Sequence, residues 1–135
     1  MKTKRCVGAV IYNDEMKIFL MTSPKWNCWV IPGGRIEDGE SEEEALHREI
    51  KEELNINITN LVKVGEQMKE PSESFIDKKV QFHFINFFAK AMPGEIKTNE
   101  EIDTWGWFSI TEALELNLLH TTKVLLEQFK DQHNL

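Results

Sequence analysis

The sequence predicts an α+β domain in which a mixed β-sheet is sandwiched between helices, an αβα arrangement. Three observations lead to this fold class. Strand-like and helix-like segments alternate along the chain. The 135 residues suffice for one hydrophobic core but not for two. No repeat, linker or low-complexity segment interrupts the pattern. We therefore expect a single domain over residues 1–135.

Three strands are expected before the first helix, at residues 5–12, 16–22 and 29–31. The first is rich in β-formers, and a cluster of turn residues, Asn-Asp-Glu, separates it from the second. A loop that opens with Ser-Pro-Lys leads to the third strand, which Pro32 ends. The Pro-Gly-Gly run that starts at this proline is interpreted as a turn, after which the long central helix begins.

The second half of the sheet comes from three further segments. Residues 58–69 give a strand signal, and the polar residues 70–79, which contain Pro71, are expected to form a loop. Residues 80–92 carry four phenylalanines and give the strongest strand signal of the chain, which a Pro-Gly pair ends. Residues 105–110 form the last expected strand.

Two helical segments close the chain. Thr111 begins a short one, and residues 118–129 are expected to form a C-terminal helix. Its apolar residues fall roughly on one side, which is typical of a helix that packs against a sheet. With the central helix, the chain would carry about two long helices, one for each face of the sheet.

Composition and charge exclude several classes of protein. Of the residues, 41% are hydrophobic and 29% are charged, as in soluble globular proteins. No apolar run approaches a membrane span, and the basic start lacks a signal-peptide cleavage site, so we expect a cytoplasmic protein with no membrane partner. The net charge of −7 argues against a stable nucleic-acid partner. The two cysteines, Cys6 and Cys28, indicate neither a zinc site nor a disulfide framework.

The central helix has signals at both ends and an apolar stripe between them. Ser41 and Glu44 form a capping box, so the helix starts at Ser41. Asn55 follows the last apolar residue and is able to adopt the left-handed conformation that ends a helix. Small or apolar residues recur at helical spacing, namely Ala45, Leu46, Ile50 and Leu54.

Three glutamates lie on an arc beside the apolar stripe. Glu49, Glu52 and Glu53 are spaced i, i+3 and i+4, so their carboxylates converge. Hard oxygen ligands in such a cluster suit Mg²⁺ or Mn²⁺. Spacing alone also fits a solvated acidic face, in which Arg48 pairs with Glu44 or Glu52 four residues away.

The order of these parts closely resembles the box of the Nudix hydrolase family. That box runs Gly, five residues, Glu, seven residues, Arg-Glu, an aliphatic, one residue, Glu-Glu, one residue, Gly and an aliphatic. The matching residues here are Gly34, Glu40, Arg48, Glu49, Ile50, Glu52, Glu53 and Ile56. The final glycine is replaced by Asn55, which also tolerates the left-handed conformation, so we expect the geometry to survive. The segments 29–34, 100–101 and 107–108 resemble the family's flanking elements, so the resemblance covers nearly the whole chain and implies the Nudix fold.

The resemblance implies a role for each matching residue. Glu52 and Glu53 would be the main metal ligands, and Glu49 would bind a second metal or help to activate water. The backbone carbonyl of Gly33 and one late acid, Glu100 or more specifically Glu101, are candidate further ligands. Two residues would orient these carboxylates, namely Arg48 and Glu40. Which acid is the general base stays open.

Candidate substrate-binding residues are fewer and rest on position. Arg35 directly follows Gly34 and is the better placed of two arginines that we expect near phosphates; the other is Arg5. Trp26 lies in the loop before the box and is a candidate for stacking on a base, with a surface or dimer contact as the alternative. Trp29 is expected to pack under the turn.

The implied activity is metal-dependent hydrolysis of a pyrophosphate bond in a nucleoside diphosphate derivative. A nucleotide sugar such as ADP-ribose and a nucleoside triphosphate both fit; Pro71 stands where many ADP-ribose-cleaving members have a proline. The alternative is a non-catalytic Nudix-like module that binds a nucleotide or metabolite and regulates a partner. Loss of box acids would indicate that alternative, and none is lost. A monomer and a homodimer both fit the sequence.

Overall fold

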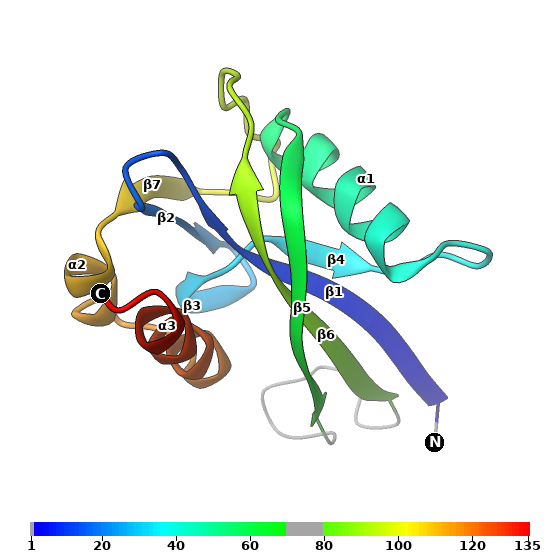
Figure 1. Cartoon of the computed structure of the whole chain (residues 1–135). Helices are drawn as coiled ribbons and strands as arrows, with labels where there is room; N and C mark the ends of the chain where they lie inside the picture. Colours follow the sequence, from blue (N-terminus) through cyan, green and yellow to red (C-terminus); the bar gives the residue numbers. More distant parts are fainter. Residues whose placement is uncertain (1, 70–79) are drawn as a thin grey trace.

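The computed structural model describes residues 2–69 and 80–135, which form a mixed β-sheet with helices on both of its faces (Figure 1). The strands are β1 (Lys2–Tyr12), β2 (Ile18–Ser23), β3 (Trp26–Val30), β4 (Gly33–Arg35), β5 (Ile58–Lys69), β6 (Val80–Ala91) and β7 (Thr104–Phe108). The helices are α1 (Glu42–Leu54), α2 (Ile110–Leu114) and α3 (His120–Gln132). The loop expected at residues 70–79, with Pro71, lies outside the described residues.

Strand β1 is the centre of the sheet. The main path runs β3-β2-β1-β6-β5, with β4 added beside β1 and β7 beside β2. Strands β1 and β6 run parallel over their whole length, whereas the other pairs are antiparallel. The sheet is therefore mixed, as the sequence predicts, and the fold class is confirmed.

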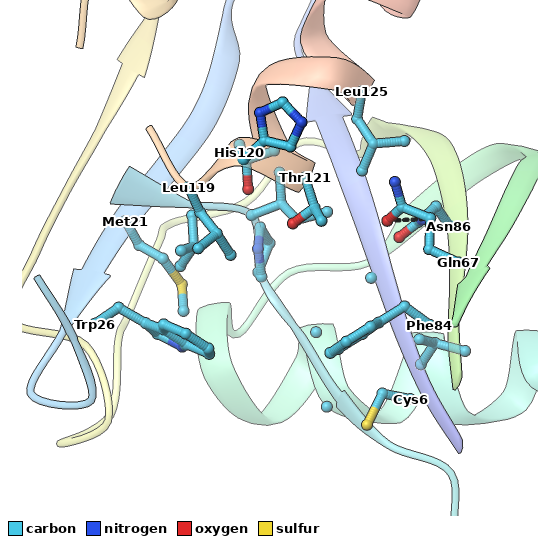
Figure 2. Close-up of a pocket in the computed structure, with 18 of the residues that line it drawn as sticks. Cys6, Met21, Trp26, Gln67, Phe84, Asn86, Leu119, His120, Thr121 and Leu125 are labelled. Carbon is cyan, nitrogen blue, oxygen red and sulfur yellow. Dashed lines mark hydrogen bonds between the residues drawn. The ribbon is translucent and has the colours of Figure 1, made fainter. Parts of the chain in front are cut away.

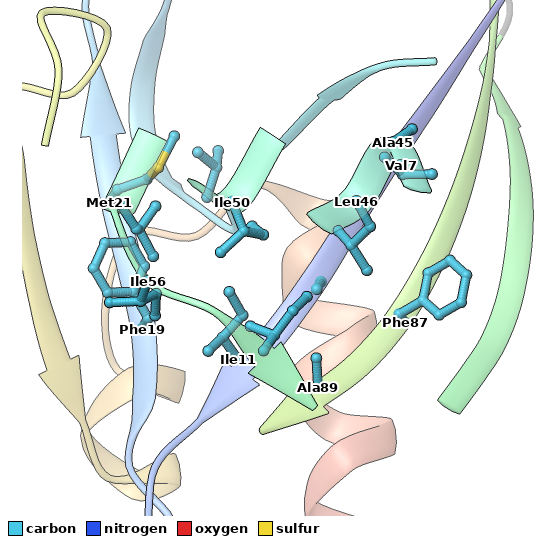
Figure 3. Close-up of a cluster of buried hydrophobic side chains, with 14 of the residues drawn as sticks. Val7, Ile11, Phe19, Met21, Ala45, Leu46, Ile50, Ile56, Phe87 and Ala89 are labelled. Carbon is cyan, nitrogen blue, oxygen red and sulfur yellow. The ribbon is translucent and has the colours of Figure 1, made fainter. Parts of the chain in front are cut away.

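Alternate residues of β1 point into two separate hydrophobic clusters. Val7, Ala9 and Ile11 pack in the cluster that contains the buried side of α1, which Figure 3 shows. Val10, between them, packs in the cluster that contains α2 and α3. Because side chains alternate between the faces of a strand, β1 is buried on both sides. This placement gives the αβα layering, with α1 on one face and α3 on the other.

The central helix begins and ends as its sequence predicts. The Ser41 side chain accepts a hydrogen bond from the Glu44 backbone N–H at 3.1 Å, and the Glu44 side chain accepts one from the Ser41 N–H at 3.0 Å. Asn55 ends the helix in the left-handed region, with φ 62° and ψ 29°. The four small or apolar residues of the predicted stripe are all fully buried, namely Ala45, Leu46, Ile50 and Leu54. The two caps set where α1 begins and ends, and the buried stripe sets which side of α1 packs on the sheet. Together they determine where the acidic side chains of α1 lie.

Two local predictions before the helix are wrong. The segment Gly33–Arg35 is not part of a turn but forms strand β4, antiparallel to β1. Trp26 lies not in a loop but at the start of β3. In both cases pairing with a neighbouring strand decides the conformation, and a local pattern of glycines or a nearby proline does not reveal that partner.

The C-terminal part differs from the prediction in its boundaries. The expected helix over 118–129 begins at His120, because the residues before it pair with β3: the Leu119 N–H donates to the Trp29 carbonyl at 3.1 Å. Trp29 packs edge-on against Phe108, with ring centroids 5.2 Å apart. Together with the short α2 there are three helices in the described residues. No helix in residues 2–69 or 80–135 is long and apolar enough to cross a membrane.

Candidate functional site

Glu53 is a buried carboxylate on the side of α1 that faces the sheet. It is 2% exposed, and its Oε1 atom has no hydrogen-bond partner within the described part of the chain. Burial and, after it, the neighbouring carboxylates of Glu49 and Glu101 raise the pKa of Glu53 to about 8, against a backbone hydrogen bond from Gly33 that lowers it. An unpaired buried carboxylate is costly unless a cation or a proton neutralises it. The carboxylate oxygens of Glu53 and its acidic neighbours are the kind of ligand that a hard divalent cation prefers.

Glu49 lies beside Glu53 and against the backbone of β4. A Cβ atom added at Gly34 would overlap the Glu49 carboxylate, so only glycine allows this approach. The preceding Gly33 is packed as tightly against β1, where an added Cβ would overlap the Val7 carbonyl. Burial raises the pKa of the Glu49 carboxyl, against hydrogen bonding from Arg48, which lowers it. The two glycines thus bring backbone atoms of β4 to the acidic cluster.

Arg48 holds the acids of this region in place. Its guanidinium makes a bidentate pair with Glu40, with Nε–Oε2 and Nη2–Oε1 distances of 2.7 and 2.9 Å. Its Nη1 donates to Glu49 Oε1 at 2.9 Å, and its Nη2 also donates to the Arg35 carbonyl at 2.9 Å. The hydrogen bonds from Arg48 hold the pKa of Glu40 at about 2, well below its usual range. Arg48 therefore ties the Glu40 loop and β4 to the Glu49 carboxylate.

Glu52 does not join the buried cluster, which differs from the predicted convergence of three carboxylates. Its side chain is 57% exposed, and its Oε2 lies 3.4 Å from Arg48 Nη1. Across residues 2–69 and 80–135, no three His, Cys, Asp or Glu side chains form a ready-made metal cluster. The structure thus places Glu52 at the solvent edge of the arc, with Glu53 fully buried and Glu49 partly buried beside it.

Glu101 approaches the cluster from the loop before β7. Its charge raises the pKa values of both Glu49 and Glu53, which places it near them. Asn99 holds this loop on the helix: its Oδ1 accepts from the Glu101 N–H at 3.0 Å, and its Nδ2 donates to the Glu52 carbonyl at 3.4 Å. The late acid that the family resemblance implies therefore lies within electrostatic range of Glu49 and Glu53.

A cavity of about 240 Å³ opens next to this cluster, on the α3 face of the sheet (Figure 2). Gly33 and Gly34 line it on one side, so the backbone that touches the acids also forms a wall of the cavity. Arg35 and Trp26, predicted as substrate-binding residues, both line it. Arg5 does not; its Nη2 pairs with Glu42 Oε2 at 2.9 Å.

Several cavity residues were missed from the sequence. They are Asn86 of β6, Gln67 of β5 and His120 at the start of α3. Phe84 of β6 also lines the cavity, and the sequence had left one phenylalanine of this strand as a candidate for a base pocket. Four phenylalanines in one strand pointed to a core, and two of them, Phe87 and Phe88, are indeed buried. For Asn86, the only sequence feature that could have indicated a place in the cavity is that it is polar within a largely apolar strand.

Comparisons with known proteins agree on one family. The NUDIX domain model matches residues 2–129. A zebrafish (Danio rerio) protein named 8-oxo-dGDP phosphatase is 34% identical over 72% of this chain, which spans only 28% of that protein. The CTP pyrophosphohydrolase of Escherichia coli is 32% identical over 96% of this chain and 93% of its own. The solution structure of the E. coli ORF135 protein superposes with a TM-score of 0.79 at 29% identity, covering 98% of this chain and 92% of that one.

Proposed function

Because the chain belongs to the Nudix hydrolase family, we propose that it cleaves a pyrophosphate bond of a nucleoside diphosphate derivative by attack of water on phosphorus. The candidate substrates are a nucleoside triphosphate and a nucleotide sugar such as ADP-ribose. The observation that carries the proposal is Glu53, a box acid that is buried with an unpartnered oxygen and with Glu49 and Glu101 nearby. Such an arrangement is unfavourable by itself and suits a site that binds a cation during its reaction.

The cation that we propose is Mg²⁺, with Mn²⁺ as a substitute. Glu49, Glu52 and Glu53 would hold it together with the Gly33 carbonyl, and Glu101 is a further candidate ligand. When bound, the cation would lower the pKa of water and offset the negative charge of the phosphoryl oxygens. The exposed Glu52 carboxylate would have to turn from Arg48 towards the cluster.

The residues of the chain itself supply orientation and proton transfer. Arg48, fixed by its bidentate pair with Glu40, orients the Glu49 carboxylate. The proton of the attacking water passes to one of the carboxylates of the cluster. Gly34 lets the Glu49 carboxylate lie against the backbone of β4, because any side chain at this position would occupy the space of Glu49.

The rest of the substrate would lie in the cavity beside β4. Arg35 would face the phosphates as they leave the acidic cluster, and Trp26 would contact the base. Arg5 is the weaker candidate for a phosphate contact because Glu42 already pairs with it. The relatives named 8-oxo-dGDP phosphatase and CTP pyrophosphohydrolase favour a nucleoside di- or triphosphate over a nucleotide sugar.

Loss of a box acid would indicate the alternative, a non-catalytic regulatory module, and all of the box acids are present. A cytoplasmic location and a monomeric or homodimeric state stay predictions from the sequence.

A substrate panel tests the proposed function. We expect release of two phosphate compounds from at least one member of a panel that contains the common nucleoside triphosphates, ADP-ribose and dinucleoside polyphosphates. The release should require Mg²⁺ or Mn²⁺ and stop in the presence of a chelator. Chromatography of the products measures it and identifies the bond that is cut. An absence of turnover on every member with either ion would favour the non-catalytic alternative.

A further inference from the structure

The floor of the cavity carries one polar side chain between two glycines. Asn86 of β6 pairs in register with Gly8 of β1 on one side and with Gly65 of β5 on the other. Residues directly opposite one another in adjacent strands point to the same face of the sheet. Asn86 is therefore the only residue of its row that has a side chain, and it lies on the face that the cavity occupies.

The two glycines leave room beside Asn86. Glycine inside a strand is unfavourable and often marks a place where another group approaches the backbone closely. A Cβ atom added at Gly65 would have nothing within 4 Å, and one at Gly8 would first meet Ile31 Cδ1 at 3.2 Å. No side chain of β5 therefore covers Asn86 from the position directly opposite it.

Asn86 is a buried amide with unused hydrogen-bonding capacity. It is 4% exposed and is one of three buried polar or charged residues in the described ranges; the others are Glu53 and Thr122. Its Nδ2 donates to Gln67 Oε1 at 3.3 Å, and no other hydrogen bond of its side chain occurs among the described residues. Gln67 is its diagonal neighbour across β5 and β6 and also lines the cavity. This pair leaves further donors and acceptors of both amides for a ligand.

Two aromatic side chains lie across the cavity from one another. Trp26 and Phe84 point towards each other from opposite sides, with the Asn86–Gln67 pair beyond them (Figure 2). Phe84 is held in position by stacking on Phe82, with ring centroids 5.9 Å apart and planes inclined by 16°. Flat aromatic walls beside an amide pair suit a ligand that is planar, apolar on its faces and polar at its edge.

We propose that Asn86, positioned by Gln67, reads the hydrogen-bonding edge of the substrate's nucleobase, which enters between Trp26 and Phe84. This inference rests on the proposed function, which supplies the nucleotide. The chemical class is a base that presents a donor and an acceptor side by side, since an amide matches that pair of groups with two hydrogen bonds. Gly33 and Gly34 line the same cavity and touch the acids, so the phosphates of a base in this position would extend towards Glu49 and Glu53.

Binding of the four common ribonucleosides, measured by calorimetry in a chelator, tests the base site without phosphates or metal. Wild-type protein should bind one nucleoside at least about tenfold more tightly than the weakest of the four, because the bond to Gln67 fixes the orientation of the Asn86 amide, and its donor and acceptor then match the order of these groups on only some of the four base edges. Asn86→Leu should bring the four dissociation constants within about threefold. Gln67→Leu changes a half-buried position of the edge strand and should likewise bring the four dissociation constants close together. It serves as the test variant if Asn86→Leu does not fold. The exposed Asn57→Leu is the matched control and should bind as wild type does.

The second measurement of base selectivity is the order of the kcat/KM values for the four corresponding nucleoside triphosphates. Asn86→Leu should flatten that order mainly through KM. The inference would be overturned if both cavity variants kept the wild-type order. It would also be overturned if wild-type protein bound the four nucleosides equally. Neither result would count against the proposed hydrolase activity. Selective nucleoside binding without hydrolysis of any triphosphate would support the base site and count against the proposed hydrolase.

Discussion

Glu53→Gln is expected to lower turnover by at least about a hundredfold while the fold stays intact. The substitution keeps the size of the side chain but removes its negative charge, so the proposed cation site would lose a ligand from its buried centre. Substitution of a residue that only supports a metal ligand typically lowers metal affinity or activity 10- to 100-fold, and substitution of a ligand itself should lower it more. Initial rates at saturating Mg²⁺, on the best substrate of the panel, measure the loss.

The matched control for this experiment is Glu43→Gln. Glu43 is exposed in the first turn of the same helix, ten residues before Glu53. We expect its turnover to equal that of wild type. Circular dichroism of both variants checks that α1 is still formed. Wild-type turnover by a folded Glu53→Gln protein would show that this residue is not part of the catalytic machinery.

The second large effect concerns the stability of the metal-free protein. Burial and the neighbouring acids raise the pKa of Glu53 from 4.5 to about 8. Between these two values the folded protein keeps a proton that the unfolded chain has released, so the contribution of Glu53 to the free energy of unfolding falls as pH rises. The slope is about 1.4 kcal/mol per pH unit, which amounts to a few kcal/mol across the window. Below pH 4.5 the penalty is absent.

Glu53→Gln should remove this pH dependence, because the amide does not ionise. In a chelator, the variant should become progressively more stable than wild type as pH rises from 5 to 8, by a few kcal/mol at the upper end. Urea unfolding at several pH values measures the difference, which cancels the titration of groups common to both proteins. Saturating Mg²⁺ should reduce or reverse the difference, since bound cation stabilises the wild-type fold. A difference that does not change with pH would contradict a buried, protonated Glu53.

The sequence predicted the central helix well because its signals are local. Ser41, Glu44 and Asn55 fix its ends through contacts within one or two turns, and the apolar stripe follows from helical spacing. The same spacing put Glu52 with Glu49 and Glu53, yet the structure separates it. Periodicity gives the angle of a residue around the helix, but the neighbouring β4 decides which acids on that arc are covered.

The cavity could not be predicted in the same way, since its residues meet only through strand pairing. Asn86 lies beside Gly8 and Gly65, which are distant in sequence, and its partner Gln67 lies across the β5–β6 pair. Strand β4 was missed for the same reason: a Gly-Gly pair has the local character of a turn, and its pairing with β1 depends on tertiary structure.

Direct measurement of Mn²⁺ binding by electron paramagnetic resonance tests the central claim, that the acids of α1 form a divalent-cation site. It needs no knowledge of the substrate. Wild-type protein and Glu43→Gln should bind Mn²⁺ with the same affinity, Glu53→Gln should bind it at least about tenfold more weakly, and Mg²⁺ should displace it. Equal Mn²⁺ affinity of Glu53→Gln and wild type, or no binding to the wild-type protein, would contradict the account.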